Sequence, residues 1–159
     1  MWLCNSSIGR KVVMSVTGVA LILFLTFHMS MNIAALFSGD AYNMICEFLG
    51  ANWYALVATL GLAALAVIHI VYAFWLTMQN RRARGSERYE VTTRPAGVEW
   101  ASQNMLVLGI VIILGLLLHL FNFWYNMMFA ELTGITVAHD PADGFAYIQD
   151  TFSCPVYVV

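Results

Sequence analysis

The stretch "ALILFLTFHMSMNIAALF", residues 20–37, places one histidine inside a run of residues that otherwise suits the interior of a lipid bilayer. The same arrangement recurs in "LAVIHIVYAFW", residues 65–75, and in "GLLLHLFNFWY", residues 115–125. Each stretch contains a single histidine, and these are His28, His69 and His119. The fold therefore has to accommodate three imidazoles in three separate apolar segments.

Three long gaps between charged residues locate the apolar segments. The gaps lie between Lys11 and Asp40, between Glu47 and Arg81, and between Glu99 and Glu131. Each gap exceeds the roughly 20 residues that a helix needs to cross about 30 Å of hydrocarbon. Backbone groups in lipid must find hydrogen-bond partners within their own element, which favours helices over open sheets. We predict an all-α transmembrane bundle with helices near 11–36, 52–80 and 100–129.

The composition agrees with a membrane protein. The chain of 159 residues is 61% hydrophobic and only 10% charged, whereas soluble domains carry about 25% charged residues. The net charge is −2 and no basic stripe is present, which argues against nucleic-acid binding. The first apolar run is longer than the usual 7–15 residues of a signal peptide and has no small-residue cleavage site, so we expect it to remain in the protein.

The basic residues predict the orientation in the membrane. All seven lie before the first span or between the second and third: Arg10, Lys11, Arg81, Arg82, Arg84, Arg88 and Arg94. The segments 37–51 and 130–155 contain none. Cytoplasmic loops carry an excess of Lys and Arg, so the N-terminus and the 81–99 loop are predicted to be cytoplasmic. The arginines suit contact with anionic lipid, and equally the docking of an acidic soluble partner.

The C-terminal segment 130–155 reads as a polar, acidic outer loop. The following "CPVYVV" begins another apolar run, and a proline is favourable in the first turn of a helix. We therefore expect one domain over 1–159 that ends in the stub of a fourth span, truncated at its C-terminus; a short apolar tail is the alternative. Cys46 and Cys154 fall on the same predicted side, and their spacing leaves a disulfide between them open. No CxxCH motif indicates covalent haem attachment.

The depths of the histidines suggest a chemical role. A helix rises about 1.5 Å per residue, so His28 lies roughly 25 Å from Lys11, His119 roughly 30 Å from Glu99, and His69 roughly 18 Å from Arg81. His28 and His119 thus share a level in the outer half of the bilayer, and His69 lies nearer the cytoplasm. Two imidazoles on different helices can bind a haem iron from opposite faces.

We predict that His28 and His119 form such a pair, and that the partner of His69 lies outside this chain. The alternative is that each histidine only bonds a neighbouring helix. His139 belongs to the outer loop and is expected to be solvated. Helical spacing aligns two stripes of side chains with the paired histidines. They are Thr17, Leu21, Leu25, His28 and Asn32 on the first helix, and Ile112, Gly115, His119, Asn122 and Asn126 on the third.

Other positions on the helices suggest further contacts with a haem or a quinol. Gly115 would let a flat macrocycle approach the backbone. Asn32, Asn122, Asn126 and Glu47 are candidates for a polar quinol pocket in which Glu47 accepts protons. The competing interpretation is that the asparagines cap helix ends and Glu47 is a hydrated surface charge. Ser15 could reach a propionate of an inner haem, or bond back to its own helix.

Three stretches give the chain a resemblance to a known family: "SSIGRKVVMSVTGVALILFLTFHMSMN", "AVIHIVYAFWLTMQNRRARGSERYE" and "GLLLHLFNFWYN". The chain resembles the cytochrome b membrane anchor of succinate:quinone oxidoreductase, also called fumarate reductase, in its single-chain, two-haem form. The resemblance covers nearly the whole chain and rests on the order and spacing of the helices. It implies a bundle of five helices, of which this chain contains three and a stub.

The resemblance also implies cofactors, partners and roles. His28 and His119 would ligate the distal haem b and His69 the proximal one, with the fourth ligand beyond the chain end. Ser15 would lie near the proximal propionates, and Glu47 would be an acidic residue of a menaquinone site. The partners would be an iron–sulfur subunit and a flavoprotein subunit, in the bacterial inner membrane. The chain would then transfer electrons and leave dicarboxylate chemistry to the flavoprotein.

Two other functions are compatible with these residues. One is a haem-free membrane anchor whose histidines serve in helix packing. The other is a proton-coupled transporter that uses the three histidines as a relay, although the spans contain no Asp, Glu, Lys or Arg to complete such a path. Neither the physiological direction of the complex nor the quinone type follows from the sequence.

Overall fold

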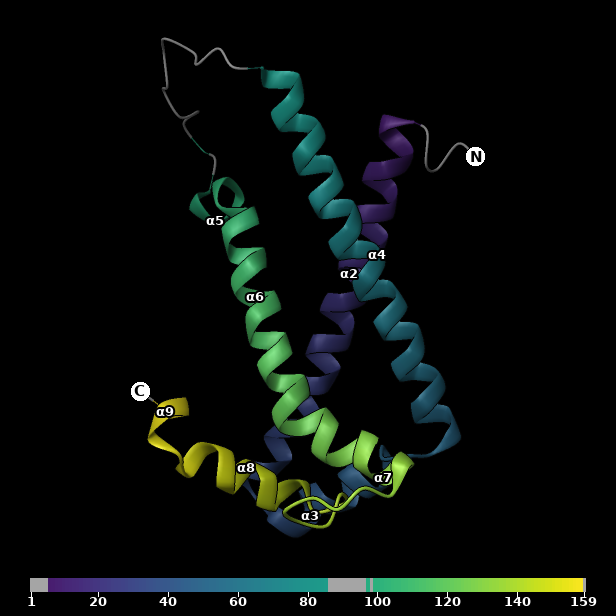
Figure 1. Ribbon diagram of the computed structural model, residues 1–159, viewed down its shortest axis with the longest axis vertical. Helices are drawn as coiled ribbons and strands as arrows, with labels where there is room; N and C mark the ends of the chain where they lie inside the picture. Colours follow the sequence, from purple (N-terminus) through teal and green to yellow (C-terminus); the bar gives the residue numbers. More distant parts are fainter. Residues whose placement is uncertain (1–5, 86–96, 98, 159) are drawn as a thin grey trace.

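A computed structural model describes residues 6–85, 97 and 99–158, and these residues contain no β-strand. The all-α prediction is therefore confirmed for the described chain (Figure 1). The elements are α2 (Ser7–Asn32), η1 (Ile33–Leu36), α3 (Gly39–Phe48), α4 (Trp53–Arg84), α5 (Trp100–Gln103), α6 (Met105–His119), η2 (Leu120–Phe129), α7 (Ala130–Thr133), α8 (Gly144–Ser153) and α9 (Pro155–Val158). Cys4, Arg88 and Arg94 lie outside the described residues.

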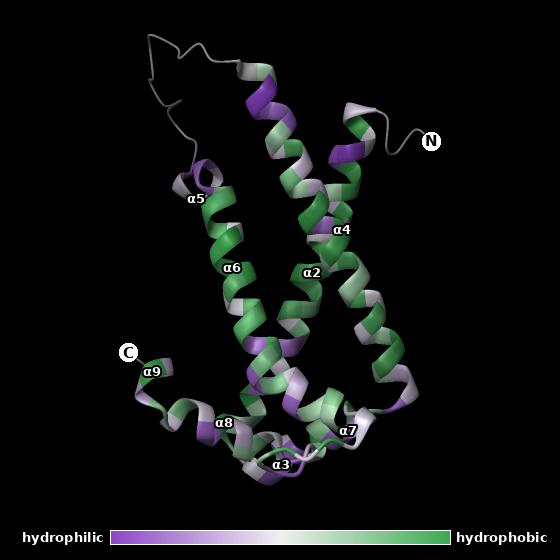
Figure 2. Cartoon of the chain, viewed as in Figure 1, coloured by the Kyte–Doolittle hydropathy of each residue, from purple (hydrophilic) through white to green (hydrophobic). Residues whose placement is uncertain are grey.

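Three continuous helical stretches are long and apolar enough to cross a membrane, which indicates an integral membrane protein. They run over Ser7–Leu36, Trp53–Ala83 and Met105–Thr133. The three predicted spans are confirmed, although the first starts four residues before its predicted limit and the second ends three residues after its own. The third starts later, because a separate short helix, α5, precedes it. The spans are mostly apolar with a few hydrophilic patches along them, and further polar residues lie at the two ends of the bundle (Figure 2).

The two ends differ in charge. The basic end, defined by Arg10, Lys11, Arg81 and Arg82, is where α2 begins and α4 ends. The acidic end, defined by Asp40, Glu47, Asp140 and Asp143, contains α3 and the turns before α8. Figure 1 shows α3, α7 and α8 gathered at one end of the three long helices, away from the N-terminus.

Side-chain caps fix where several helices begin. The hydroxyl of Ser6 accepts a hydrogen bond from the Gly9 amide at the start of α2, and Ser38 accepts one from Ala41 at the start of α3. Such caps satisfy amides that have no partner within the helix. Immediately after the C-terminal end of α7, Gly134 adopts a φ of +70°, a left-handed conformation that glycine accepts without strain. The chain can therefore turn sharply out of the third span.

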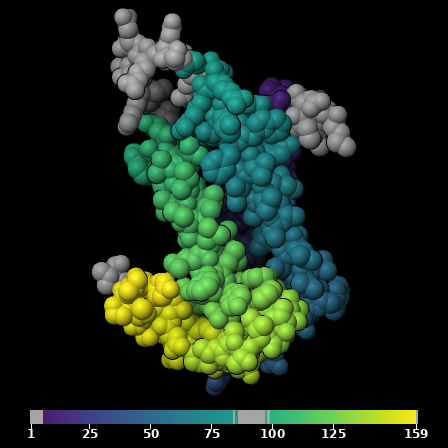
Figure 3. Space-filling model, in the orientation of Figure 1, coloured from purple at the N-terminus to yellow at the C-terminus, as the bar shows by residue number. Residues whose placement is uncertain are grey.

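The segment 130–155 was predicted as a polar loop, and this prediction is wrong for its second half. Ten residues form α8, which packs against α3 and η2 and covers the acidic end (Figure 3). The side chain of Asn43 in α3 fixes the start of α8. The Asn43 amide group donates to the Asp143 carboxylate at 2.7 Å, and the Asn43 side-chain oxygen accepts from the Phe145 backbone amide at 2.9 Å. The sequence of α8 has few charged residues and is too short to show the apolar pattern of a membrane span. It therefore resembled a polar loop.

The long helices contact one another mainly at two places. The first and second spans, α2 and α4, cross near Thr17 and His69, and α2 meets the third span near His28. At the basic end, Arg10 donates to the Gln79 oxygen at 2.6 Å and lies 5.0 Å from the Trp75 ring centroid. Elsewhere the apolar side chains face outward. In a bilayer, lipid tails solvate these surfaces as well as protein does.

The third span changes its helical form immediately after His119. Residues Leu120–Phe129 form a π-helix, η2, in place of the predicted regular α-helix. A π-helix has i→i+5 hydrogen bonds, and π segments are frequent at functional sites. The Asn126 side chain donates to the carbonyl oxygens of Phe121 and Asn122, which adds two bonds within this wider helix. The 3.6-residue periodicity used to align Asn122 and Asn126 with His119 therefore does not apply to this segment.

Candidate functional site

The structure brings His28 and His119 together. Their ring centroids lie 5.6 Å apart with an angle of 84° between the ring planes. His28 is four residues from the end of α2, and His119 is the last residue of α6. The predicted common level of these two histidines is therefore confirmed. Both rings are half-buried, and an aromatic side chain one turn away packs against each: Phe24 at 5.4 Å from His28 and Phe123 at 5.3 Å from His119.

The spacing of the two rings suits a shared metal ion. Metal–imidazole bonds of about 2 Å on opposite sides of one ion place the ring centroids about 6 Å apart. The observed 5.6 Å is close to this value. Among the described residues, no group of three or more His, Cys, Asp or Glu side chains could hold a metal ion. A haem iron needs only two axial ligands from the protein, so a pair of imidazoles is a sufficient donor set.

Space for a macrocycle exists one turn from His119. A Cβ added at Gly115 would meet nothing within 4 Å, and the same is true of Gly109 two turns further along α6. Along α6 the large apolar side chains such as Ile112 and Leu116 are exposed. The residues around His28 and His119 therefore offer what a b-type haem needs from a protein: two neighbouring imidazoles, an open helix face and apolar surroundings.

His69 lies in a different setting. Its Nδ1 atom is 2.9 Å from the Thr17 hydroxyl oxygen, and a Cβ on Gly18 would approach its Cε1 atom to 3.3 Å. In the described chain, no second histidine has a ring contact with His69. Ser15, the hydroxyl singled out from the sequence for an inner haem, is exposed, and it is Thr17 that contacts a candidate ligand. The stripe through His28 contains Thr17, and this was the signal that would have identified it.

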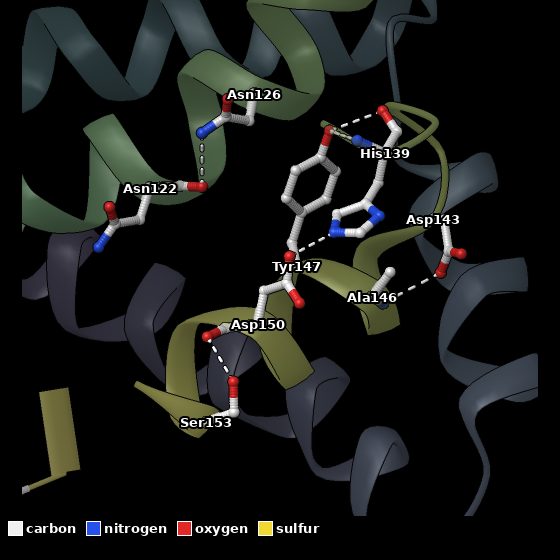
Figure 4. Close-up of polar contacts among 8 residues, drawn as sticks. All are labelled: Asn122, Asn126, His139, Asp143, Ala146, Tyr147, Asp150 and Ser153. Atoms are coloured by element: carbon white, nitrogen blue, oxygen red, sulfur yellow. Dashed lines mark hydrogen bonds and ion pairs between the residues drawn. The ribbon is translucent and has the colours of Figure 1, made fainter. Parts of the chain in front are cut away.

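The three asparagines do not converge on one pocket. Asn32 donates to the His28 carbonyl at 2.8 Å and accepts from the Tyr42 hydroxyl at 2.9 Å. Asn126 bonds back to its own helix, and the Asn122 oxygen accepts from Tyr157 at 3.4 Å. Figure 4 shows Asn122 and Asn126 on η2, above α8. The structure therefore gathers the asparagines into no shared pocket, and Asn122 and Asn126 lie within η2 and not at a helix end, so the competing interpretation as helix caps does not describe these two either.

Glu47 is exposed on α3 and lines a polar cleft at the acidic end. The cleft has a volume of about 380 Å³ and is lined by Asp40, Asn43, Met44, Glu47, Asp140, Ala142 and Asp143. An apolar groove of about 540 Å³ lies beside it, lined by Phe27, Met31, Ala41, Met44, Ile45, Phe48 and Leu49. Met44 lines both. The sequence placed Glu47 near the outer end of the bundle but did not indicate either the cleft or the groove.

The sequence predicted that His139 is solvated, but in the structure it has protein partners. Its Nε2 atom lies 2.5 Å from the Asp150 carboxylate, and its ring packs edge-on against Tyr147 (Figure 4). The Tyr147 hydroxyl also donates to the His139 carbonyl at 2.8 Å. Burial raises the pKa of Tyr147. These contacts fasten the turn before α8 to the helix itself.

Beneath α8, Tyr42 and Cys46 pack against Gly144. A Cβ at Gly144 would lie 2.4 Å from the Cys46 sulfur, so no larger residue fits without displacing α8. Burial raises the pKa of the Cys46 thiol, and it raises the pKa of Tyr42 well above its usual range. Cys46 and Cys154 are both free thiols. The disulfide that the sequence left open is absent from this part of the chain.

Comparison with known proteins identifies no relative. No family model matches the chain, no similar curated protein is found, and no solved structure matches. The functional argument therefore depends on the residues themselves.

Proposed function

We propose that this chain is a membrane-embedded b-type cytochrome, the anchor subunit of a succinate:quinone oxidoreductase or fumarate reductase. The observation that carries the proposal is the proximity of the His28 and His119 rings, whose centroids lie 5.6 Å apart on two different spans. The resemblance of the three histidine-containing stretches to that family supports the proposal. In a membrane span, a polar ionisable residue is costly and usually functional, and two in contact from different spans suggest a shared ligand.

The residues of the chain would have distinct roles. His28 and His119 hold the iron of a haem b, and Phe24 and Phe123 keep the two imidazoles oriented by packing on them. Gly115 leaves the helix face open for the macrocycle. His69 is the ligand for a second haem b, together with a histidine from outside this chain. A haem bound in this way supplies one-electron transfer.

The proposed quinone site lies at the acidic end of the bundle. A menaquinol is an apolar isoprenoid tail joined to a polar ring, and the apolar groove and the polar cleft meet at Met44. The tail would occupy the groove and the ring the cleft. Glu47 would accept protons released from the ring, as a general base within hydrogen-bond reach.

The remaining partners would bind at the basic end. Arg10, Lys11, Arg81 and Arg82 lie on this end, which the bias of basic residues towards the cytoplasm places inside the cell. The iron–sulfur subunit would dock there, and the flavoprotein subunit would carry out the dicarboxylate reaction. The membrane would be the bacterial inner membrane.

The test is a reduced-minus-oxidised visible spectrum of the 159-residue chain, produced in bacterial membranes and purified in detergent. We expect the absorption bands of a b-type haem, with haem that extracts into acidic acetone because it is not covalently attached. A protein that is folded and helical by circular dichroism but lacks these bands would contradict the proposal. That result would favour the haem-free membrane anchor.

A further inference from the structure

Thr17 is the one buried polar or charged residue among those that the structure describes, and it contacts a candidate metal ligand. Thr17 is only 4% exposed and lies at the crossing of α2 and α4. The hydroxyl oxygen lies 2.8 Å from the Val13 carbonyl oxygen, 3.2 Å from the Met14 carbonyl oxygen and 2.9 Å from His69 Nδ1. These three distances decide where the protons lie.

The hydroxyl of Thr17 has a single proton, and carbonyl oxygens can only accept. If that proton points to Val13 or Met14, the hydroxyl oxygen keeps lone pairs for the imidazole, and His69 must donate from a protonated Nδ1. If the proton instead points to His69, two oxygen lone pairs face each other at 2.8 Å with no proton between them. Only the first arrangement makes both contacts hydrogen bonds.

A neutral imidazole carries one proton on its two nitrogens. With the proton on Nδ1, the lone pair is on Nε2. Among the described residues, none forms a hydrogen bond with Nε2 of His69. Gly18 lies beside the ring, since a Cβ added there would approach the His69 Cε1 atom to 3.3 Å.

We propose that Thr17 is a positioning residue that holds His69 in its Nδ1-protonated tautomer, so that Nε2 is the nitrogen available to bind a metal. Metal-bound histidines commonly donate their other ring N–H to an oxygen acceptor, which sets ring orientation and ligand basicity. That Nε2 binds a haem iron rests on the proposed function; the tautomer itself does not.

The test is ¹⁵N NMR of the haem-free chain with ¹⁵N-labelled histidine in detergent micelles, at about pH 8, where an ordinary histidine is neutral. The His69→Gln variant assigns the His69 signals. In the unsubstituted chain we expect a protonated Nδ1 and an unprotonated Nε2. In Thr17→Val, which keeps the shape and removes the hydroxyl, we expect the Nδ1-protonated form to lose its predominance. Thr17→Ser should retain it.

Ser15→Ala is the matched control, because it removes an exposed hydroxyl two residues away on the same helix. It should leave the His69 signals unchanged. A protonated Nε2 in the unsubstituted chain would overturn the proposal by itself, and so would a Thr17→Val variant with an unchanged tautomer. The measurement uses no haem, so its outcome is independent of whether the purified chain shows b-type bands.

Discussion

At the scale of single residues, the polar groups within the spans have one of two kinds of partner. Thr26, Ser30 and Thr77 bond back to carbonyls of their own helices, which satisfies them without any tertiary contact. The three span histidines instead reach across to another helix, and Thr17 does both, because its hydroxyl contacts the Val13 carbonyl of its own helix and His69 of α4. Because burying an unpaired polar group is costly, the second set needs a partner in the folded state, from the protein or from a ligand.

Glu47 gives the first prediction at this scale. If it accepts the protons of a bound quinol, Glu47→Gln should slow the oxidation of a water-soluble menaquinol analogue by about 10²-fold, within the usual range for loss of a general base. The rate of haem reduction by the analogue, followed by stopped flow, measures this effect.

The matched control is Asp150→Asn, which removes a carboxylate at the same end of the bundle but outside the cleft. It should leave the quinol rate within about twofold. Equal rates in Glu47→Gln and in the unsubstituted protein would remove Glu47 from the mechanism, and the haem assignment would stand without it.

At the scale of elements, glycines determine how closely helices approach. A Cβ at Gly39 would enter the Phe145 ring, and one at Gly144 would collide with Cys46, so both positions mark tight helix crossings. Gly109 and Gly115 of α6 differ, because nothing lies within 4 Å of their added Cβ atoms. Close helix packing therefore explains why glycine occupies positions 39 and 144. It does not explain the glycine at position 115, which packs against none of the described residues.

Gly115 therefore yields a prediction about ligand space. Gly115→Leu should fold normally, because the position is open and leucine favours a helix by nearly 1 kcal/mol relative to glycine. We expect it to lower the haem content per chain at least several-fold, because the side chain would occupy the space beside His119. Gly109→Leu, equally open but further from His119, should retain full haem content. Similar haem content in the two variants would argue against a macrocycle at Gly115.

The cap of α8 predicts a response to acid. The Asp143 carboxylate accepts a hydrogen bond from the Ala146 amide and one from the Asn43 side chain, and these bonds lower its pKa. A folded-state pKa below the unfolded value stabilises the fold above about pH 4, and this stabilisation is lost as the pH falls through the folded-state pKa.

Hydrogen exchange of the amides in the first turn of α8, corrected for intrinsic rates, measures this effect. Their protection should fall progressively below about pH 4 in the unsubstituted protein. Asp143→Asn keeps a capping side chain that does not titrate, so its protection should be independent of pH in this range. A pH-dependent loss that persists in Asp143→Asn would assign the effect to another group.

The elements also show what the sequence could predict. Spans of more than 20 residues without charge favour helices over open sheets in lipid, and the depth calculation was sufficient to pair His28 with His119. The π-helix after His119 could not be predicted, because its register depends on hydrogen bonds such as those of Asn126. Neither could α8, whose position depends on a long-range contact with Asn43. Local pattern does not encode contacts of this kind.

At the scale of the whole molecule, charge is distributed along the long axis. All seven basic residues lie before the first span or between the second and third, which predicts a single orientation in the membrane. Ser102→Cys and Thr133→Cys place a thiol near opposite ends of the third span, at exposed uncharged positions. With the native cysteines replaced by serine, a membrane-impermeant thiol reagent should label Thr133→Cys in cells with a permeabilised outer membrane. Ser102→Cys should react only after the inner membrane is opened, and the reverse pattern would contradict the orientation.

The central claim is that His28 and His119 bind one iron from opposite sides. Near-infrared magnetic circular dichroism of the oxidised chain identifies both axial ligands of a low-spin haem. We predict a bis-histidine signal in the unsubstituted chain and in the His139→Ala and His69→Ala variants. His28→Ala and His119→Ala should each lose the bis-histidine signal, because the two residues ligate the same iron. An unsubstituted chain without this signal, or a His28→Ala or His119→Ala variant that keeps it in full, would contradict the account.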